Sequence, residues 1–301
     1  MKKRVLTGIL AGVLAFGALA GCGSKEQNSQ SDAATGNAAD NAAVEGTEAA
    51  QAETPEAKGT IKVAASATPH AEILEQVKPI LAEQGWNLEV TVFDDYIQPN
   101  NVVESGEFDA NYFQHIPYLD NFNVEHGTSL VNAGGIHYEP FGIYPGTKSS
   151  LDELADGDAI AVPNDTTNEA RALLLLQDNG IITLKEGAGL EATVKDIAEN
   201  PKNIKIEELE AAQVSRVADE VAFVVLNGNY ALQAGFSVAN DAVAYEQSDS
   251  QAAQTYVNVI AVKEGNESQE GIQALVSALK SDEIKQFIQN TYDGAVISFE
   301  E

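Results

Sequence analysis

Arg171 is the residue whose position points most directly to a chemical role. Beyond residue 4, Arg171 and Arg216 are the two arginines of a chain with 46 acidic and 17 basic residues. The pattern Thr166-x-x-Glu169 predicts a capping box, which places Arg171 in or just beyond the first turn of a helix, where the helix dipole disfavours a cation. Two explanations stay open. The guanidinium either receives a ligand carboxylate beside backbone N–H groups or forms a structural ion pair with one of the many acidic residues.

Two asparagines are the next candidates for contacts to a polar ligand. Asn168 lies one helical turn before Arg171 and is expected to face the same way. Asn227 follows residues 221–226, the most apolar predicted strand of the chain, where a polar side chain needs a partner. That partner is either an amino or carboxylate group of a ligand or a neighbouring backbone group.

An aromatic segment supplies a candidate wall for an apolar ligand group. Residues 111–118 contain Phe113, His115 and Tyr118 in close succession, and Tyr96 follows the predicted strand 87–93. Aromatic walls with a few polar atoms suit a small amphipathic ligand. The alternative is that these rings belong to the ordinary core, because large rings also dominate cores.

Catalysis and metal binding receive little support from the sequence. It contains no Gly-x-Ser-x-Gly elbow, Walker loop or His-Glu-x-x-His motif, so we expect no catalytic residue. The histidines show no i, i+4 pair, and we expect no metal and no cofactor. A zinc or manganese site drawn from His70, His115 and His137 remains an open alternative, since ligands at separate strand ends can converge in space.

The elements that must position these residues alternate along the chain. Apolar runs predict strands, and capping boxes and helical spacing predict helices between them. The predicted strands are 61–66, 87–93, 158–162 and 221–226, and the predicted helices include 167–179, 268–279 and 281–292. This alternation predicts an α/β fold with mostly parallel sheets, in which ligands lie beyond the C-terminal ends of the strands.

The first 59 residues predict an export signal and a tether. Residues 1–21 have the basic start, short apolar run and small-residue end of a signal peptide, and Leu19-Ala20-Gly21-Cys22 resembles the lipobox of bacterial lipoproteins. We therefore expect Cys22 to carry the lipid anchor. Residues 22–59 are rich in small and polar residues and predict a flexible tether, which leaves about 60–301 as the folded part.

The charge balance excludes one class of partner. The net charge is −29, and without the basic residues at positions 2–4 there are 14 basic against 46 acidic residues, a net charge of −32. Such a surface repels nucleic-acid phosphates and anionic lipid headgroups, so we expect no nucleic-acid partner. The single Cys excludes a disulfide framework within the chain.

Several segments together resemble the NlpA-type methionine-binding lipoproteins, which are substrate-binding components of a methionine ABC importer. The match covers essentially all of 60–301 in the same order. It is carried by the lipobox, Pro69-His70-Ala71-Glu72-Ile73-Leu74, Phe113-Gln114-His115 with Pro117-Tyr118-Leu119, Val162-Pro163-Asn164-Asp165, Asn168, Arg171-Ala172-Leu173-Leu174-Leu175-Leu176-Gln177, Glu199-Asn200-Pro201-Lys202-Asn203 and Asn227-Gly228-Asn229-Tyr230-Ala231.

The resemblance implies a two-lobed periplasmic-binding-protein-like fold that closes on one amino acid. Lobe 1 is placed at about 60–142 plus 250–301, and lobe 2 at about 143–249. Arg171 is implied to pair with the ligand carboxylate, with Asn168 and Asn227 as further polar contacts. The side chain of the ligand is implied to lie among a second group of residues, namely Tyr96, Phe113, His115 and Tyr118.

The resemblance also implies a receptor that is not an enzyme. Its ligand is L-methionine or a close analogue, and its partners are a membrane permease with its ATPase. We expect a monomer that is anchored by lipid to the cell membrane and faces the extracytoplasmic side. Two alternatives remain. One is another ligand of the same class, such as a methionine dipeptide, D-methionine or another apolar amino acid. The other is a metal-binding receptor or an exported metalloenzyme.

Overall fold

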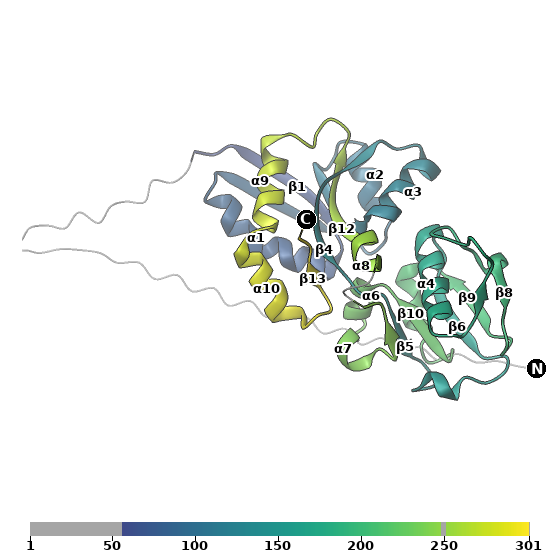
Figure 1. The fold of residues 1–301 in the computed structure, drawn as a ribbon. Coiled ribbons are helices and arrows are strands. Elements are labelled where there is room, and N and C mark those ends of the chain that lie inside the picture. The colour runs from purple at the N-terminus through teal and green to yellow at the C-terminus, as the bar shows by residue number, and fades with distance from the viewer. Residues whose placement is uncertain (1–55, 248–250, 301) are drawn as a thin grey trace, which may run out of the picture. The chain divides into compact units, whose positions relative to one another are not determined.

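The computed structural model describes residues 56–247 and 251–300, which fold into two lobes, each built on one sheet (Figure 1). The predicted signal peptide, Cys22 and most of the predicted tether lie outside the described residues. The chain joins the fold slightly before residue 60, because Lys58 N donates to Gly85 O at 2.8 Å and the first strand begins at Gly59.

The first lobe is a six-stranded sheet in the order β13-β4-β12-β3-β1-β2. Its strands are β1 (Gly59–Ala65), β2 (Trp86–Val92), β3 (Ala110–His115), β4 (Leu130–Tyr138), β12 (Val257–Lys263) and β13 (Ile297–Ser298). Its helices are η1 (Ala67–Ala71), α1 (Glu72–Ala82), α2 (Gln98–Glu104), α3 (Ile116–His126), α9 (Glu270–Leu279) and α10 (Asp282–Tyr292). Pro79 lies inside α1, and the helix continues past it to Ala82.

Helices cover both faces of this sheet, because side chains alternate along each strand. Ile260 and Val262 of β12 pack with α1, α9 and α10 in the largest core cluster. Val259 and Ala261 of the same strand pack on the opposite face, with Val103 of α2 and residues of α3. Burial on both faces explains why this strand is apolar almost throughout.

The second lobe is a five-stranded sheet in the order β11-β5-β10-β6-β9. Its strands are β5 (Gly142–Pro145), β6 (Ala159–Pro163), β9 (Lys205–Leu209), β10 (Phe223–Leu226) and β11 (Ala244–Tyr245). Its helices are η2 (Leu151–Glu153), α4 (Thr166–Asp178), α5 (Ala211–Val214), η4 (Ser215–Val217), α6 (Gly228–Gln233) and α7 (Val238–Asp241). Phe223 and Val225 face the cluster of α4, whereas Val224 and Leu226 face that of α5 and α6.

Four further elements lie outside these two sheets or connect them. A two-stranded sheet pairs β7 (Thr183–Leu184) with β8 (Ile197–Glu199), next to η3 (Val194–Asp196), and α8 (Gln251–Thr255) precedes β12. Across the described ranges, no helix combines the length and the apolar character needed to cross a bilayer.

The chain passes between the sheets twice, from β4 to β5 and from β11 to β12. Both sheets are mixed, where mostly parallel sheets were expected. In the first, β2, β1 and β3 are parallel, but β12 is antiparallel to β3 and β4. In the second, β9, β6 and β10 are parallel, and β5 is antiparallel to β10 and β11. A strand that leaves a lobe and a strand that returns beside it run in opposite directions, which accounts for the antiparallel β4 and β12 pair.

Candidate ligand-binding site

A cavity lies where the two lobes meet, and we call it the interlobe cavity. All seven ligand contacts expected from the sequence line it: Tyr96, Phe113, His115, Tyr118, Asn168, Arg171 and Asn227. The structure therefore brings together side chains that are far apart in the sequence. The cavity also has lining residues that were not expected: Gln114, Glu139, Gly228, Asn229 and Asn258.

The first lobe contributes the aromatic part of the lining. The ring of Tyr96 lies 5.6 Å from that of Phe113 and 5.7 Å from that of Tyr118, between centroids. The Tyr118 hydroxyl donates to Tyr96 O at 3.0 Å, which holds the loop after β2 against α3. Phe113 and Tyr118 are buried together with Phe122, and the partly buried Tyr96 packs against them, so one aromatic cluster serves both as core and as cavity wall.

His115 is held in a single neutral tautomer. Its Nδ1 accepts from the backbone N–H of Tyr118 at 3.1 Å and so caps α3. Its Nε2 therefore carries the proton and donates to Asn168 Oδ1 at 3.0 Å. Burial, with a further contribution from the charge of Arg171, lowers the pKa of His115 to about 3. His115 therefore acts in this cavity as a neutral donor.

Asn168 is positioned by the start of α4. The cap of this helix is Asp165, which accepts from the backbone N–H of Asn168 at 3.1 Å, so the helix begins one residue before the position predicted from Thr166. Asn168 Nδ2 also donates to Asp165, and its Oδ1 accepts from Asn227 Nδ2 at 2.8 Å. Asn168 is thus held from three sides, by Asp165, His115 and Asn227.

Two amide atoms of the lining lack a partner within the described part of the chain. They are Asn227 Oδ1 and Asn229 Nδ2, and both are buried. Asn229 Oδ1 accepts from the Tyr96 hydroxyl at 2.5 Å, across the two lobes. Buried polar groups are nearly always hydrogen-bonded, so the free acceptor and the free donor at this cavity are available to a polar group of a ligand.

Arg171 lies further into α4 than the first turn and is buried. Its Nε donates to Glu246 Oε1 at 2.8 Å and its Nη2 to Glu246 Oε2 at 2.5 Å, so Glu246 occupies one edge of the guanidinium. Nη2 also donates to Glu139 O at 3.0 Å. Its Cζ lies 4.0 Å from the centroid of the Tyr256 ring. Arg171 therefore makes a structural ion pair and lines the cavity, and Nη1 takes part in neither bond to Glu246.

Glu139 is the acidic residue of the lining, and the sequence analysis missed it. It follows β4 on the connection into the second lobe and is 5% exposed. Burial raises the pKa of its carboxyl, while His70, the backbone N–H of Asn229 and Arg171 oppose this rise. Gly228 permits the close approach, since a Cβ at that position would lie 2.7 Å from Glu139 Oε2. Glu139 follows a strand that the sequence did not predict and precedes Pro140, so no local pattern of the sequence marks it.

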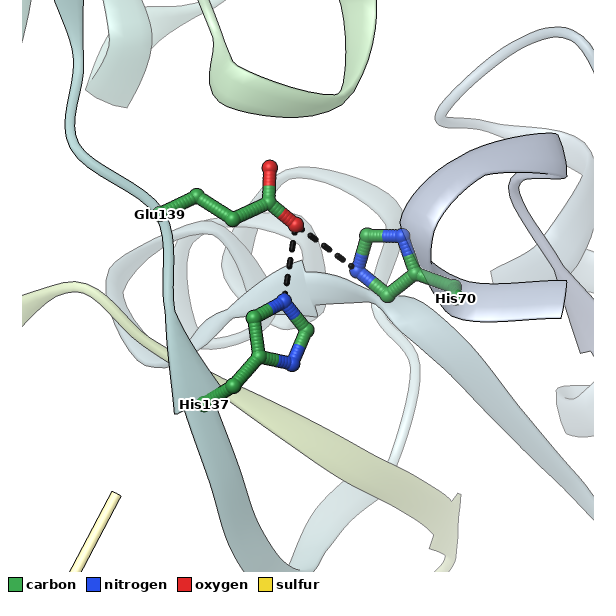
Figure 2. Close-up of side chains that lie close together, drawn as sticks. All are labelled: His70, His137 and Glu139. Carbon is green, nitrogen blue, oxygen red and sulfur yellow. Dashed lines mark hydrogen bonds and ion pairs between the residues drawn. The ribbon is translucent and has the colours of Figure 1, made fainter. Parts of the chain in front are cut away.

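Among the described residues, Glu139 and two histidines form a group of side chains of the kind that can bind a metal ion. One donor atom each of His70, His137 and Glu139 lies within 4.8 Å of the others, and Figure 2 shows the two rings directed at one carboxylate oxygen. His115, the third histidine of the alternative raised from the sequence, is not part of this group. His137 Nε2 lies 2.8 Å and His70 Nε2 lies 3.4 Å from Glu139 Oε1, which are the distances of hydrogen-bonded or ion-paired groups.

Comparison with known proteins gives the family. The family model described as NlpA lipoprotein matches residues 61–299. The methionine-binding lipoprotein MetQ of Bacillus subtilis is 42% identical over 81% of this chain and 89% of its own length. A lipoprotein from Ruminococcus gnavus, of known crystal structure, is 78% identical with a TM-score of 0.80, over 80% of this chain and 99% of that chain.

A further solved structure carries a ligand. A nutrient binding protein from Burkholderia cenocepacia, bound to methionine, is 44% identical with a TM-score of 0.76, over 80% of this chain and 100% of that chain. The matched region spans both lobes of the structure described above. The chain belongs to the NlpA lipoprotein family.

Proposed function

We propose that this chain is a lipid-anchored receptor that binds methionine outside the cytoplasmic membrane and delivers it to an ABC permease and its ATPase. The proposal includes Cys22 as the lipidated residue, a monomeric receptor and the absence of enzymatic activity. It is supported by the family, by the names of the relatives and by the chemistry of the interlobe cavity.

One observation carries the proposal for the ligand. The described lining of a single buried cavity contains one carboxylate, Glu139, one guanidinium, Arg171, and an aromatic wall. A free amino acid with an apolar side chain carries the complementary set of an ammonium, a carboxylate and an apolar group. A zwitterion brings an ammonium for Glu139, which has no cation bonded to its side chain among the described residues, and a carboxylate for Nη1 of Arg171, which is not used in the ion pair with Glu246.

The head group is assigned to the second-lobe end of the cavity. The ligand carboxylate is proposed to lie against Arg171 Nη1 and the free Asn229 Nδ2, next to Asn168. The ligand ammonium is proposed to lie against Glu139 and the free Asn227 Oδ1. Each assignment pairs a donor with an acceptor and satisfies the two amide atoms that have no partner among the described residues.

The thioether side chain is assigned to the aromatic end. Tyr96, Phe113 and Tyr118 offer ring faces and edges, and His115 offers a neutral imidazole. Sulfur–aromatic contacts and the burial of a methionine side chain each contribute favourably, the burial by about 2–3 kcal/mol. That amount is too small for tight binding, so most of the affinity must come from the charged head group.

The test is calorimetric titration of the purified chain with a panel of ligands, preceded by mass spectrometry of any molecule that co-purifies. The panel contains L-methionine, D-methionine, leucine and a methionine-containing dipeptide. We expect L-methionine to bind with a stoichiometry of one and to raise the melting temperature more than the others do. Tighter binding of D-methionine or of the dipeptide would replace the proposed ligand, and no binding by any of the four would refute the receptor for amino acids.

A metal receptor is the second candidate, favoured by the cluster of His70, His137 and Glu139. Zinc is normally held by such residues at about 2.0–2.2 Å, with the remaining ring nitrogen of each histidine bonded to a further group. His70 Nδ1 has no such partner among the described residues. Metal analysis of the purified chain decides between the candidates, and one equivalent of zinc or manganese would favour the metal receptor.

A further inference from the structure

We infer that His70 and His137 are positioning residues that hold the Glu139 carboxylate as the receptor for a cationic α-amino group, so that the site accepts ligands with a free amine and rejects their deaminated or N-acylated counterparts. This inference rests on the proposed function, in which Glu139 faces the ligand ammonium. His70 and His137 do not line the interlobe cavity, so they are additional to the proposed ligand contacts. The inference also restricts the ligands to molecules with a free amine.

Both imidazoles reach the same oxygen of the carboxylate from different elements. His137 comes from β4 and its Nε2 lies 2.8 Å from Glu139 Oε1, and His70 comes from η1 and its Nε2 lies 3.4 Å from that atom. Figure 2 shows the two rings converging on Oε1 while the second oxygen points away from both. Two donors on one oxygen fix the rotation of the carboxyl group and leave the other oxygen for a different partner.

The outer contacts of the rings explain why each Nε2 carries the proton. His137 Nδ1 is hydrogen-bonded to the Tyr112 hydroxyl, which can donate to it and leave the proton on Nε2. His70 Nε2 also lies 3.1 Å from Asn258 Oδ1, so it faces two acceptors and must be a donor. His70 Nδ1 has no partner among the described residues, which suits a nitrogen without a proton better than one that must donate.

With the proton on Nε2 and none on Nδ1, each of the two rings is a neutral donor. The remaining groups that act on Glu139 are the charge of Arg171 and the backbone N–H of Asn229, both of which favour the ionised carboxylate. Glu139 is thus surrounded by donors but has no cation bonded to its side chain among the described residues, since Arg171 bonds only its backbone oxygen.

A buried carboxylate that is hydrogen-bonded only by neutral donors favours the binding of a ligand cation. Hydrogen bonds alone leave the charge uncompensated in a region of low dielectric, and an ammonium in the cavity supplies the missing charge. A deaminated analogue leaves Glu139 in its unfavourable state, and an N-acyl group removes the cation and adds bulk. The structure thus favours discrimination at the amine that is independent of the side chain.

The test compares L-methionine with 4-(methylthio)butanoate, which has the same side chain and carboxylate but no amine, by calorimetry on the purified chain. His137→Leu removes the donor, whereas His137→Gln keeps an N–H at the position of Nε2. We expect His137→Leu to weaken methionine binding about tenfold to a hundredfold while the analogue changes less than threefold, and His137→Gln to recover most of the loss. The same pair of substitutions at His70 should show a smaller effect, because its contact is longer. His126→Leu, at an exposed position, is the matched control.

The outcomes separate this inference from the proposed function. If the unmodified chain binds neither methionine nor the analogue, the proposed function fails. If it binds methionine but His137→Leu weakens both ligands by the same factor, the histidine has only a structural role and the inference fails.

A second measurement covers the case in which the variants do not fold. Nitrogen-15 NMR of the histidines in the unmodified chain should show His70 and His137 neutral, with the proton on Nε2, at pH 7. A proton on Nδ1 of either ring, or one bound equivalent of added zinc that displaces the Nε2 proton, would overturn the inference.

Discussion

Two glutamates of this protein, the buried Glu139 and the partly buried Glu246, lie at the two connections between the lobes and have opposite electrostatic environments. Glu246 accepts from Arg171 Nε and Nη2, from the Tyr138 hydroxyl at 2.7 Å and from the backbone N–H of Phe141 at 3.1 Å. Glu139 accepts from neutral histidines and a backbone N–H. One carboxylate is neutralised inside the protein, and the other is not.

This difference separates a structural charge from a charge available to a ligand. Glu246 completes an ion pair that packs against Tyr256 and ties α4 to the chain after β11. Arg171 also donates to Glu139 O, so a single guanidinium contacts both connections between the lobes. Charge compensation thus indicates a structural role for Glu246 at the connection after β11 and supports the proposed ligand contact of Glu139.

Removing Arg171 should have the largest effect, because it disturbs both roles. We expect Arg171→Ala to nearly abolish methionine binding and to lower the free energy of unfolding by about 3–5 kcal/mol, since Glu246 is left buried without its cation. The double variant Arg171→Met with Glu246→Gln removes both charges and should recover most of the stability but not the binding. Urea unfolding and calorimetry measure the two effects, and wild-type affinity in the double variant would exclude Arg171 as a ligand contact.

Exchanging the two glutamates for glutamine tests the comparison directly. We expect Glu139→Gln to weaken methionine binding about a hundredfold, because the ammonium loses its buried anion, and to leave the free energy of unfolding unchanged or raised. The matched variant Glu246→Gln should instead lower the free energy of unfolding by about 3–5 kcal/mol, because Arg171 loses its counterion. Equal losses of stability in the two variants would contradict the distinction.

The dependence of stability on pH should reveal the neutral histidines around Glu139. The folded-state pKa values of His70, at about 4, and His137, at about 3, lie below the unfolded value of 6.5, so unfolding takes up protons below pH 6.5. Their stabilisation is present above pH 6.5 and is lost as the pH falls towards the folded values. Each should lower the free energy of unfolding by about 1 kcal/mol between pH 7.5 and 5.5.

Glutamine at one of these positions removes one such contribution. The difference in the free energy of unfolding between pH 7.5 and 5.5, measured by urea unfolding, should therefore be about 1 kcal/mol smaller in His137→Gln than in the unmodified chain. The raised pKa of Glu139 acts in the opposite direction, so the same comparison is made in the Glu139→Gln background. An unchanged difference in both backgrounds would show that folding does not lower the pKa of His137.

The sequence could predict some residues of the candidate site but not Glu139. Arg171 was identifiable because cations are rare in this chain, Tyr96 because it follows a predicted strand, and Phe113 and Tyr118 because they lie close together in an aromatic segment. Glu139 was not, because one carboxylate among 46 acidic residues has no distinguishing composition. What distinguishes it is burial beside two histidines, one of which lies far away in the sequence.

In the fold, too, features specified by local sequence were predictable and features that join distant segments were not. Local apolar patterns predicted β1, β2, β6 and β10 to within a few residues, because a buried strand consists mainly of apolar residues that can be recognised in the sequence. The pairing of β12 with β4 joins segments more than a hundred residues apart, and no local pattern specifies it. The expectation of mostly parallel sheets therefore missed the antiparallel strands at the lobe connections, which is also where the unexpected lining residues Glu139 and Asn258 lie.

The aromatic end of the cavity should show the smallest effects, because no charge is involved there. Tyr118→Phe keeps the ring and removes the hydroxyl that donates to Tyr96 O at 3.0 Å. Loss of one neutral hydrogen bond costs about 1 kcal/mol, so we expect the affinity for methionine to fall less than fivefold and the melting temperature to fall by a few degrees. Calorimetry measures the loss of methionine affinity in Tyr118→Phe and in Glu139→Gln, so that the two losses can be compared. A loss in Tyr118→Phe as large as that in Glu139→Gln would mean that closure of the loop after β2, rather than charge compensation at the head group, limits binding.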